Sequence, residues 1–212
     1  MTPFSRSVYN KRMEYKTVAL VLNAPEIKTE IAESAIVAAD GGFRHVKGKK
    51  VLALIGDFDT LCDIPEGVDI VRFPVEKNST DGELALDYIK SLGAEKAVIY
   101  GGFGGKPEHV IGNLNLLAYA DSLNMRAEIL DGDTRAFFTR HTLEINCETG
   151  DSVSVFPFGG SAVVARSESL YYPLENLLLE PQKSRGISNR ATSDKVLLEV
   201  SSGAITVIVR RG

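Results

Sequence analysis

Six short, almost uninterrupted apolar runs between Thr17 and Asp133 restrict the possible folds of this chain more than any other feature of its sequence. A run of this kind is typical of a strand that is buried on both faces, as the strands of a parallel sheet are. The runs are TVALVLN, AIVAAD, VLALIG, DIVRFP, KAVIYGG and AEILDGD. They predict an α/β domain over residues 15–133 that is built on a mostly parallel sheet.

Two helices are expected between these strands. The first is predicted to begin after an N-cap at Ser79 or Thr80 and to end at Gly93. The second is expected to run from about Glu108 to Leu123. Its predicted apolar face consists of Ile111, Leu114, Leu117 and Ala118.

The pattern changes after about Asp133. Apolar and polar residues alternate, or nearly so, in RAFFT, HTLEIN, DSVSVFPF, SAVVARS, KVLLEV and AITVIVRR. The segment Ser201–Gly203 is expected to form a hairpin turn between the last two of these strands. We therefore predict a small antiparallel β-sandwich over residues 134–212, with the boundary between Asp131 and Arg140.

The overall charge favours a small-molecule partner over nucleic acid or lipid. The 212 residues carry a formal net charge of −4.

The start, MTPFSRSVYNKRMEYK, lacks the apolar core of a signal peptide, and no apolar run approaches the roughly 20 residues that cross a bilayer. The cysteines, Cys62 and Cys147, form no pattern typical of a disulfide framework or a zinc site. We expect a cytoplasmic protein that contacts neither membrane nor nucleic acid.

Two carboxylates follow the run VLALI. Asp57 and Asp59 are expected to project to the same side of the chain, where they would repel each other unless a cation lies between them. Mg²⁺ suits such a pair, because it takes one or two carboxylates together with phosphates and water. The alternative is a surface turn that carries two solvated acids.

Asp81 lies in the first turn of the first predicted helix, after Thr80. Helix dipoles favour an acid at this position, so its charge can be explained by the helix alone. The other interpretation is a third carboxylate for the metal.

A glycine-rich segment, Gly101–Lys106, lies between the run KAVIY and the second predicted helix. Its backbone N–H groups and the helix N-terminus could bind a polyphosphate, with Lys106 as a point charge. The segment is not a Walker A loop, because the GxxxxGK spacing is not met and Pro107 replaces Ser or Thr. His109 and Asn113 lie on one face of the helix and could contact phosphate or ribose, or could simply pack.

Adjacent tyrosines in the second half, Tyr171 and Tyr172, offer flat faces on which a heteroaromatic ring could stack. Ser188 and Asn189 offer hydrogen-bonding groups that could bind the edge of such a ring. Ordinary packing of a tyrosine-rich strand is the alternative interpretation.

Taken in order, these segments resemble the thiamine pyrophosphokinase (thiamine diphosphokinase) family, and the resemblance extends from about Thr17 to Val209. It rests on Asp40–Gly42, Gly56–Thr60, Thr80–Asp81 before a helix with Glu83–Leu86, Gly101–His109 with Asn113, Leu170–Leu174, and Gly186–Asn189. The resemblance implies an α/β nucleotide-binding domain, a C-terminal β-sandwich, and a homodimer with thiamine at the subunit interface.

The resemblance also implies a role for each matching residue. Mg²⁺ would be held by Asp57, Asp59 and Asp81, which favours the metal interpretation of Asp81. The residues expected near ATP are Asp40, Gly41, Gly42, Thr80, Gly104, Gly105, Lys106, His109 and Asn113. Those expected near thiamine are Tyr172, Ser188 and Asn189. Asp40 and Glu108 are candidates for a general base.

Two segments depart from the family pattern. The family loop commonly reads GGRxDH, and here Lys106, Pro107 and Glu108 stand in its middle. Lysine lacks the bidentate fork with which arginine holds phosphate oxygens. The second departure is Ser169–Tyr172, where the family commonly has Gly-Leu, a basic residue and then Trp or Tyr.

The expected reaction is therefore the transfer of a pyrophosphoryl group from ATP to the hydroxyl group of thiamine, giving thiamine diphosphate and AMP. Two alternatives remain at this point. One is a diphosphokinase for another heterocyclic alcohol, and the other is a non-catalytic sensor that binds nucleotide or thiamine.

Overall fold

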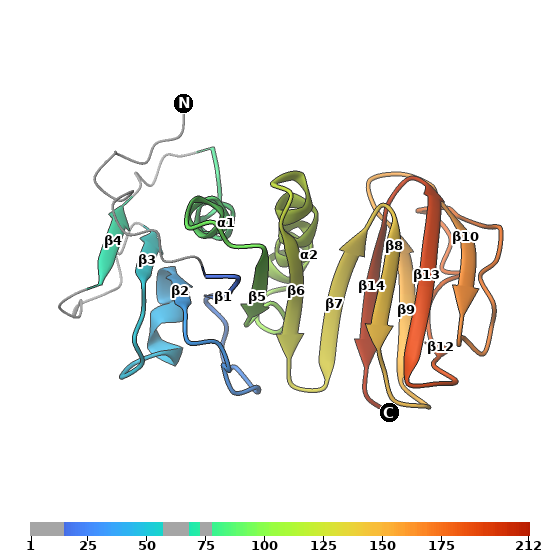
Figure 1. Ribbon diagram of the computed structural model, residues 1–212, viewed down its shortest axis with the longest axis horizontal. Coiled ribbons are helices and arrows are strands. Elements are labelled where there is room, and N and C mark those ends of the chain that lie inside the picture. The colour runs from blue at the N-terminus through green and yellow to red at the C-terminus, as the bar shows by residue number, and fades with distance from the viewer. Residues whose placement is uncertain (1–14, 57–67, 73–77) are drawn as a thin grey trace.

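The computed structural model describes residues 15–56, 68–72 and 78–212, with the side chain of Arg72 excepted. Figure 1 shows an elongated molecule with the α/β half at one end and a two-sheet half at the other. No helix among these residues is long and apolar enough to cross a membrane.

A ten-stranded sheet runs through both halves in the order β12-β9-β14-β7-β6-β5-β1-β2-β3-β4. Its strands are β1 (Thr17–Val21), β2 (Ile36–Ala39), β3 (Ala53–Gly56), β4 (Asp69–Arg72), β5 (Lys96–Tyr100), β6 (Arg126–Asp131), β7 (Thr134–Thr139), β9 (Ser152–Pro157), β12 (Asn189–Arg190) and β14 (Ile205–Arg210). The six strands from β4 to β6 pair in parallel, and the pairs from β6 to β12 are antiparallel. The six apolar runs therefore form the predicted parallel strands.

A second sheet has the order β11-β10-β13-β8 and packs on the antiparallel part of the first. Its strands are β8 (Thr142–Asn146), β10 (Ala162–Glu168), β11 (Leu177–Leu179) and β13 (Lys195–Ser202). Between the sheets lies a core that includes Ile145, Val155, Val164, Leu198 and Val207. The predicted fold class, a mostly parallel α/β half followed by an antiparallel β-sandwich, is confirmed.

The two halves share one continuous sheet, because β6 and β7 are paired neighbours from Glu128↔Phe137 to Asp131↔Thr134. The predicted boundary at residue 133 falls in the turn that joins these two strands. A division of the chain there would cut through a sheet and not through a linker.

The prediction of a hairpin turn at Ser201–Gly203 is wrong. β13 belongs to the second sheet and β14 to the first, so this segment carries the chain across the sandwich. Gly203 has φ +75°, and a Cβ added to it would lie 2.4 Å from the carbonyl oxygen of Ser161. The crossing therefore needs glycine at this point.

Both predicted helices are confirmed. α1 (Asp81–Ser91) begins after Thr80, whose hydroxyl group accepts a hydrogen bond from the backbone N–H of Glu83 at 3.3 Å. The carboxylate of Glu83 accepts one in return from the N–H of Thr80 at 2.7 Å, which completes a capping box. α2 (Pro107–Ser122) has proline at its first position, where a missing N–H does no harm.

One residue of the predicted apolar face of α2 lies elsewhere. Ile111 is 64% exposed, whereas Leu117 is buried and Leu114 packs at the edge of the core. The side chain of Ile111 instead borders a small apolar hollow together with Phe156, Phe158 and Ile208 of the neighbouring strands and loop.

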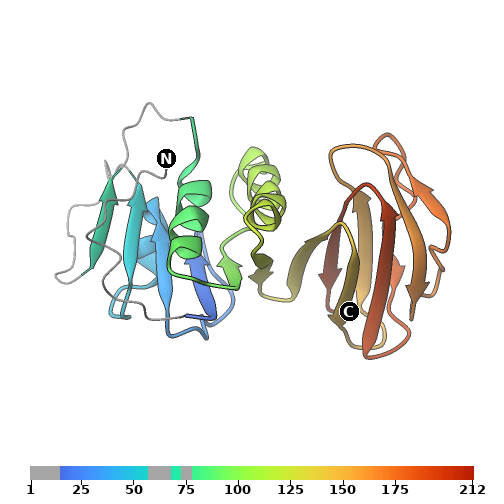
Figure 2. The same cartoon turned by 45° about the horizontal axis from the view of Figure 1, so that its top comes forward.

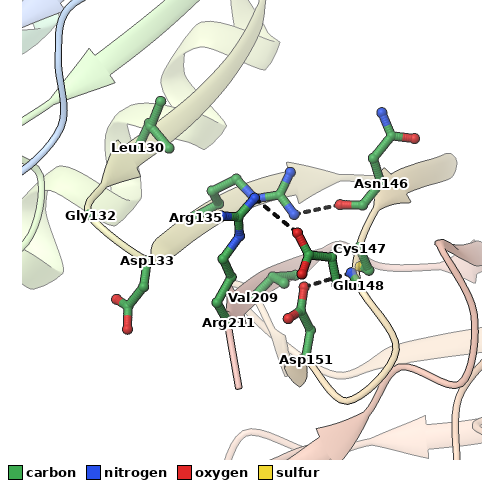
Figure 3. Close-up of a pocket in the computed structure, with 10 residues that line it drawn as sticks. All are labelled: Leu130, Gly132, Asp133, Arg135, Asn146, Cys147, Glu148, Asp151, Val209 and Arg211. Atoms are coloured by element: carbon green, nitrogen blue, oxygen red, sulfur yellow. Dashed lines mark hydrogen bonds and ion pairs between the residues drawn. The ribbon is translucent and has the colours of Figure 1, made fainter.

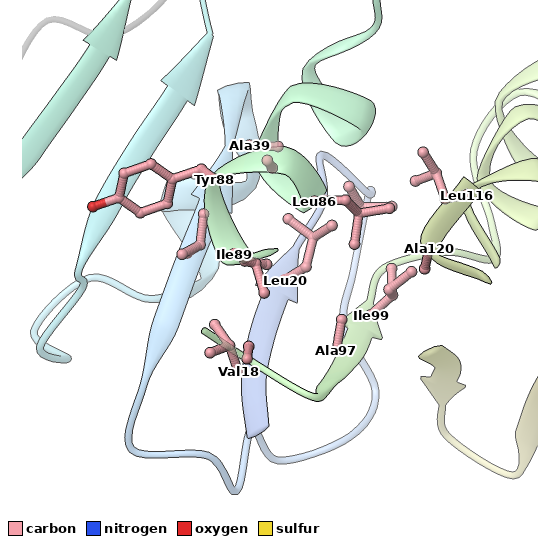
Figure 4. Close-up of a cluster of buried hydrophobic side chains, with 14 of the residues drawn as sticks. Val18, Leu20, Ala39, Leu86, Tyr88, Ile89, Ala97, Ile99, Leu116 and Ala120 are labelled. Carbon is pink, nitrogen blue, oxygen red and sulfur yellow. The ribbon is translucent and has the colours of Figure 1, made fainter. Parts of the chain in front are cut away.

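The parallel part of the sheet is covered on both faces. α1 and α2 cover one face, and Figure 4 shows Leu86, Ile89 and Leu116 packed against Leu20 and Ile99 of the sheet. The other face is covered by a 3₁₀ helix, η2 (Asp40–His45), and by the connection between β1 and β2. In Figure 2 the two helices lie side by side, with α1 in front of the parallel strands.

The order of the parallel strands fixes where a ligand can bind. β1 has β2 on one side and β5 on the other, so the chain reverses its winding direction beside β1. In open α/β sheets, ligands bind beyond the carboxyl ends of the strands at such a point. We therefore expect the loops after β1, β2, β3 and β5 to form the ligand-binding site.

Candidate active site

Asn23 and Asp40 meet at the carboxyl edge of the sheet. The side-chain nitrogen of Asn23, which follows β1, lies 3.4 Å from the Oδ2 atom of Asp40, which follows β2, and donates a hydrogen bond to it. Asp40 is therefore held from the neighbouring strand. Sequence reasoning missed Asn23, although its place at the end of the run TVALVLN was a signal that could have indicated it.

The turn after β2 requires its glycines. Asp40 has φ +45°, a left-handed conformation, and begins η2. A Cβ on Gly42 would lie 2.2 Å from the carbonyl oxygen of Val21, and a Cβ on Gly41 would lie 2.8 Å from the side chain of Asn23. Gly41 and Gly42 therefore let this turn approach the end of β1.

The end of β3 lies next to Asp40. A Cβ on Gly56 would be 3.4 Å from the Cα atom of Asp40, so the chain leaves β3 beside this carboxylate. Asp57 and Asp59 come directly afterwards, and both lie outside the described residues.

The expected Mg²⁺ site lies partly outside the described residues. Within residues 15–56, 68–72 and 78–212, no group of three His, Cys, Asp or Glu side chains could hold a metal ion. Asp81, the first residue of α1, is the one predicted metal ligand that this part of the chain includes. Carboxylate oxygens are the ligands that Mg²⁺ prefers, so the predicted set fits the metal in its chemistry, and its geometry stays a prediction.

The N-terminus of α1 is fixed against α2. A Cβ on Gly82 would lie 2.8 Å from Leu116, which shows how closely the helices approach. The hydroxyl group of Tyr119 donates a hydrogen bond to Asp87 at 3.0 Å. Burial, together with this bond, raises the pKa of Tyr119 to about 12, so the phenol stays protonated and keeps donating at neutral pH. Asp81 and Thr80 therefore have a stable position relative to α2.

The glycine loop leads from β5 into α2. Gly101, Gly104 and Gly105 have φ values of +73°, +88° and +71°, which glycine adopts readily. Asn113 donates a hydrogen bond from its side-chain nitrogen to the carbonyl oxygen of Gly102 at 3.1 Å. Asn113 was predicted to contact ATP. In the structure its side chain binds the glycine loop from the first half of α2.

The residues at the start of α2 are open to solvent. Lys106 is the N-cap and makes no side-chain capping hydrogen bond, and the side chains of Lys106, Glu108 and His109 are all exposed. The positive end of the α2 dipole and the Lys106 ammonium group thus lie together beside the glycine loop. This arrangement suits an anionic ligand.

Asn189 and Tyr172 are joined in the second half. Asn189 is buried, and its Oδ1 atom accepts a hydrogen bond from the backbone N–H of Tyr172 at 3.0 Å. Its Nδ2 atom donates to the carbonyl oxygen of Tyr172 at 2.6 Å. The amide of Asn189 is therefore used to hold the backbone of Tyr172.

An exposed aromatic surface results. Tyr171 and Tyr172 are 61% and 63% exposed, with their rings edge to face at 4.8 Å between centroids. Ile187 is also exposed, and the Arg190 guanidinium group lies 5.8 Å from the Tyr171 ring centroid. Ser188, in a left-handed conformation, donates its backbone N–H to the Ser154 hydroxyl group at 3.0 Å. We call Tyr171 and Tyr172 the tyrosine surface.

The predicted ATP site and the predicted thiamine site lie far apart within one chain. Six strand spacings separate β1, beside Asp40, from β12, which contains Asn189. At about 4.8 Å per spacing this is roughly 29 Å along the sheet. Figure 1 accordingly shows β3 and β12 in opposite halves of the molecule.

A separate hollow of about 400 Å³ lies beside the β6–β7 turn and is lined by none of the predicted site residues (Figure 3). Its two arginines already have acceptors within the chain. Arg135 donates to the carbonyl oxygen of Asn146, and Arg211 forms an ion pair with Glu148 at 3.2 Å. Neither guanidinium group is left unpaired to bind an anion.

Comparison with known proteins gives matches along most of the chain. The family model described as thiamin pyrophosphokinase, catalytic domain, matches residues 28–129. The model described as thiamin pyrophosphokinase, vitamin B1 binding domain, matches residues 140–205. The thiamine pyrophosphokinase of Bacillus subtilis (strain 168) is 24% identical over 161 residues, which cover 72% of this chain and 75% of that protein.

Solved structures agree in fold. The crystal structure of thiamine pyrophosphokinase from Bacillus subtilis superposes with a TM-score of 0.80 at 21% identity, covering 92% of this chain and 99% of that one. The thiamin pyrophosphokinase of Geobacillus thermodenitrificans gives a TM-score of 0.76 at 23% identity, with coverages of 92% and 98%.

Proposed function

Since the chain belongs to the thiamin pyrophosphokinase family, we propose how its residues perform that family's reaction. The protein is an enzyme that transfers the pyrophosphoryl group of ATP to thiamine, giving thiamine diphosphate and AMP. In this reaction the hydroxyl oxygen of thiamine forms a bond to the β-phosphorus of ATP. The bond from the β-phosphorus to the oxygen that it shares with the α-phosphate breaks, and AMP leaves with that oxygen. The assignment depends on one observation above all: a catalytic and a vitamin-binding family model match the same chain in order.

The glycine loop and the start of α2 are proposed to bind the phosphates of ATP. Gly104 and Gly105 are exposed and have no side chains of their own, so a phosphate group can approach their backbone. The exposed Lys106 side chain and the N-terminus of α2 add positive potential at the same place. Phosphoryl transfer depends mainly on positioning and charge neutralisation, and this loop supplies both. Asn113 contributes indirectly, by fixing the carbonyl group of Gly102.

Asp57, Asp59 and Asp81 are proposed to hold Mg²⁺, on the sequence pattern described above. When bound, Mg²⁺ would neutralise charge on phosphate oxygens. Asp40 and Glu108 remain the candidates for accepting the proton of the thiamine hydroxyl group. Asp40 is the better supported of the two, because Asn23 orients it and the end of β3 lies against it.

The tyrosine surface is proposed to bind thiamine, with Asn189 keeping Tyr172 in place and Ser188 next to it. Since roughly 29 Å of sheet separates this surface from Asp40 in one chain, a complete site requires two chains. We therefore propose a homodimer in which thiamine lies between the tyrosine surface of one subunit and the phosphate-binding loops of its partner.

A cytoplasmic location is also proposed. Cys147 is buried and is not in a disulfide, and burial raises the pKa of its thiol. Such a thiol is suited to a reducing compartment.

The first experiment tests the reaction and its acids. Purified protein incubated with ATP, thiamine and MgCl₂ should form AMP and thiamine diphosphate, both of which chromatography detects. Asp57→Ala should lose this activity and keep its unfolding temperature, whereas Asp194→Ala, an exposed acid of the other half, should keep both. Normal turnover by folded Asp57→Ala protein would show that Asp57 is not part of the active site.

The second experiment tests the two-chain site. Asp57→Ala and Tyr172→Ala proteins should each be impaired, and unfolding and refolding them together should restore activity. Random pairing makes half of the dimers mixed, with one intact site each, so roughly a quarter of the wild-type activity is expected. If the mixture only averages the two variants, each site is made within one chain.

A further inference from the structure

A pocket of about 240 Å³ lies at the carboxyl edge of the sheet, on the β6 side of the glycine loop. Pro25, after β1, and Phe103, after β5, provide its apolar walls. Gly104 and Gly105 border it as well, so the loop separates this pocket from the side on which Asp40 and Asp81 lie. Asp131 and Thr134 complete it from the β6–β7 turn. We call it the β6-side pocket.

Asp131 is the unusual group of this pocket. Only 9% of the residue is exposed, and its Oδ1 atom has no hydrogen-bond partner among the residues that the structure describes. Burial raises the pKa of Asp131, although the backbone N–H groups of Lys28 and Phe103 and the charge of Lys28 act against the increase. A buried polar atom without a partner is rare in native proteins and needs an explanation. A ligand that donates a hydrogen bond to Asp131 would supply one.

The charges around the pocket favour a neutral donor over an anion. Asp131, Asp133 and Glu26 contribute three carboxyl groups, and among the described residues Lys28 is the single cationic one that lines it. A phosphate group would meet more negative than positive charge here. A flat ring with an amino group fits better, because the ring can contact Phe103 and Pro25 while the amino group donates to a carboxyl oxygen.

The position of the pocket matches one end of a nucleotide. The predicted metal acids follow β3, and the pocket lies beyond β5, three strand spacings away. This is roughly 14 Å along the edge of the sheet. The glycine loop borders the pocket, and α2, into which this loop leads, packs on β6 and β7. A nucleoside triphosphate with its base in the pocket would therefore have its phosphates extending from the glycine loop toward β3.

From these observations we propose that the β6-side pocket receives the adenine ring of ATP and that Asp131 accepts a hydrogen bond from the exocyclic amino group. Asp131 then selects adenine over bases that carry a hydrogen atom or an oxygen in place of the exocyclic amino group. The inference rests on the proposed binding of ATP for its nucleotide.

Equilibrium binding tests the proposal without turnover. Calorimetry would compare AMP with purine riboside monophosphate, which has a hydrogen atom in place of the amino group, and with inosine monophosphate, which has an oxygen. The wild-type protein should bind AMP about tenfold or more tightly than either analogue, because the donor to a buried carboxyl group is lost. The preference over purine riboside monophosphate should disappear in Asp131→Ala, which leaves no acceptor for the amino group. In Asp131→Asn the amide keeps an acceptor and gains a donor, so inosine monophosphate should gain affinity in that variant.

Asp133→Ala is the matched control, because Asp133 lines the same pocket and is exposed. It should keep the wild-type preference for AMP. If Asp131→Ala fails to fold, Phe103→Leu provides a second variant, which should weaken binding of all three nucleotides alike through loss of ring contact. Equal binding of the three nucleotides by the wild-type protein would overturn the proposal, and so would an unchanged preference in folded Asp131→Ala protein.

The same proteins separate this proposal from the proposed function. Failure of the enzyme to form AMP from ATP and thiamine, together with a normal preference for AMP in binding, would contradict the reaction and leave the pocket assignment supported. Normal turnover with no preference among the three nucleotides would contradict the pocket assignment alone.

Discussion

The side-chain amide of Asn189 binds both backbone polar groups of Tyr172, at 3.0 Å from the N–H and 2.6 Å to the carbonyl oxygen. The backbone that carries an exposed aromatic ring is thus held by a buried amide.

Replacing Asn189 by alanine should affect thiamine and not ATP. The change leaves two partly buried backbone groups of Tyr172 without their partner, and each lost hydrogen bond of this kind costs about 0.5–1.5 kcal/mol. We expect a lower unfolding temperature and a KM for thiamine raised roughly tenfold, with the KM for ATP unchanged. Gln182→Ala, which removes an exposed amide of the same half, should change none of these values. A normal thiamine KM in Asn189→Ala would show that Tyr172 needs no such support.

Gly42 and Gly112 should respond in opposite ways to alanine. A Cβ at Gly42 would lie 2.2 Å from the carbonyl oxygen of Val21, so Gly42→Ala should lose about 1–3 kcal/mol of stability or more, together with activity. A Cβ at Gly112, inside α2, meets nothing within 4 Å. Gly112→Ala should therefore gain roughly 0.5–1 kcal/mol from helix propensity. Chemical denaturation measures both, and equal effects would contradict the close approach at Gly42.

Asn23 should act through Asp40. The side chain of Asn23 is exposed, so Asn23→Ala should change stability by no more than about 0.5 kcal/mol. Loss of the hydrogen bond to Asp40 should lower kcat several-fold with little change in the KM for ATP. Asn23→Asp should be worse than Asn23→Ala, because it places a like charge beside Asp40. Steady-state kinetics of the two variants test this order, and the reverse order would exclude a role through Asp40.

Asp131 should make the protein less stable as pH rises. Its pKa in the folded state is raised above the ordinary value of 3.8, first by burial, so folding favours the protonated form. The contribution is favourable at a pH below 3.8 and is lost as pH rises through the raised pKa. Asparagine does not titrate, so the stability of Asp131→Asn relative to the wild-type protein should increase from pH 3.5 to pH 7. Denaturation at several pH values would show this, and a constant difference would contradict the raised pKa.

Features that depend on local sequence could be predicted from the sequence. A continuous apolar run such as KAVIY needs cover on both faces, and it forms the internal strand β5. Thr80 and Glu83 specify the start of α1 through bonds that span three residues.

Features that depend on distant partners could not be predicted. Alternating residues identify β13 and β14 as strands but not which sheet each joins, so the segment between them was taken for a hairpin turn. The spacing of Ile111 places it on the apolar face of α2, yet only the neighbouring strands decide whether that part of the face is covered. The amides of Asn113 and Asn189 bind backbone groups 11 and 17 residues away, and sequence gives no direction for such a side chain.

The pairing of β6 with β7 has a consequence for attempts to isolate either half of the protein. Cleavage at residue 133 would leave β6 as the open edge of one fragment and β7 as the open edge of the other. Each edge would present a row of unpaired N–H and carbonyl groups, to which strands of other molecules can add. The fragments should therefore aggregate or reassociate with each other, and the two halves should unfold in a single transition rather than in sequence.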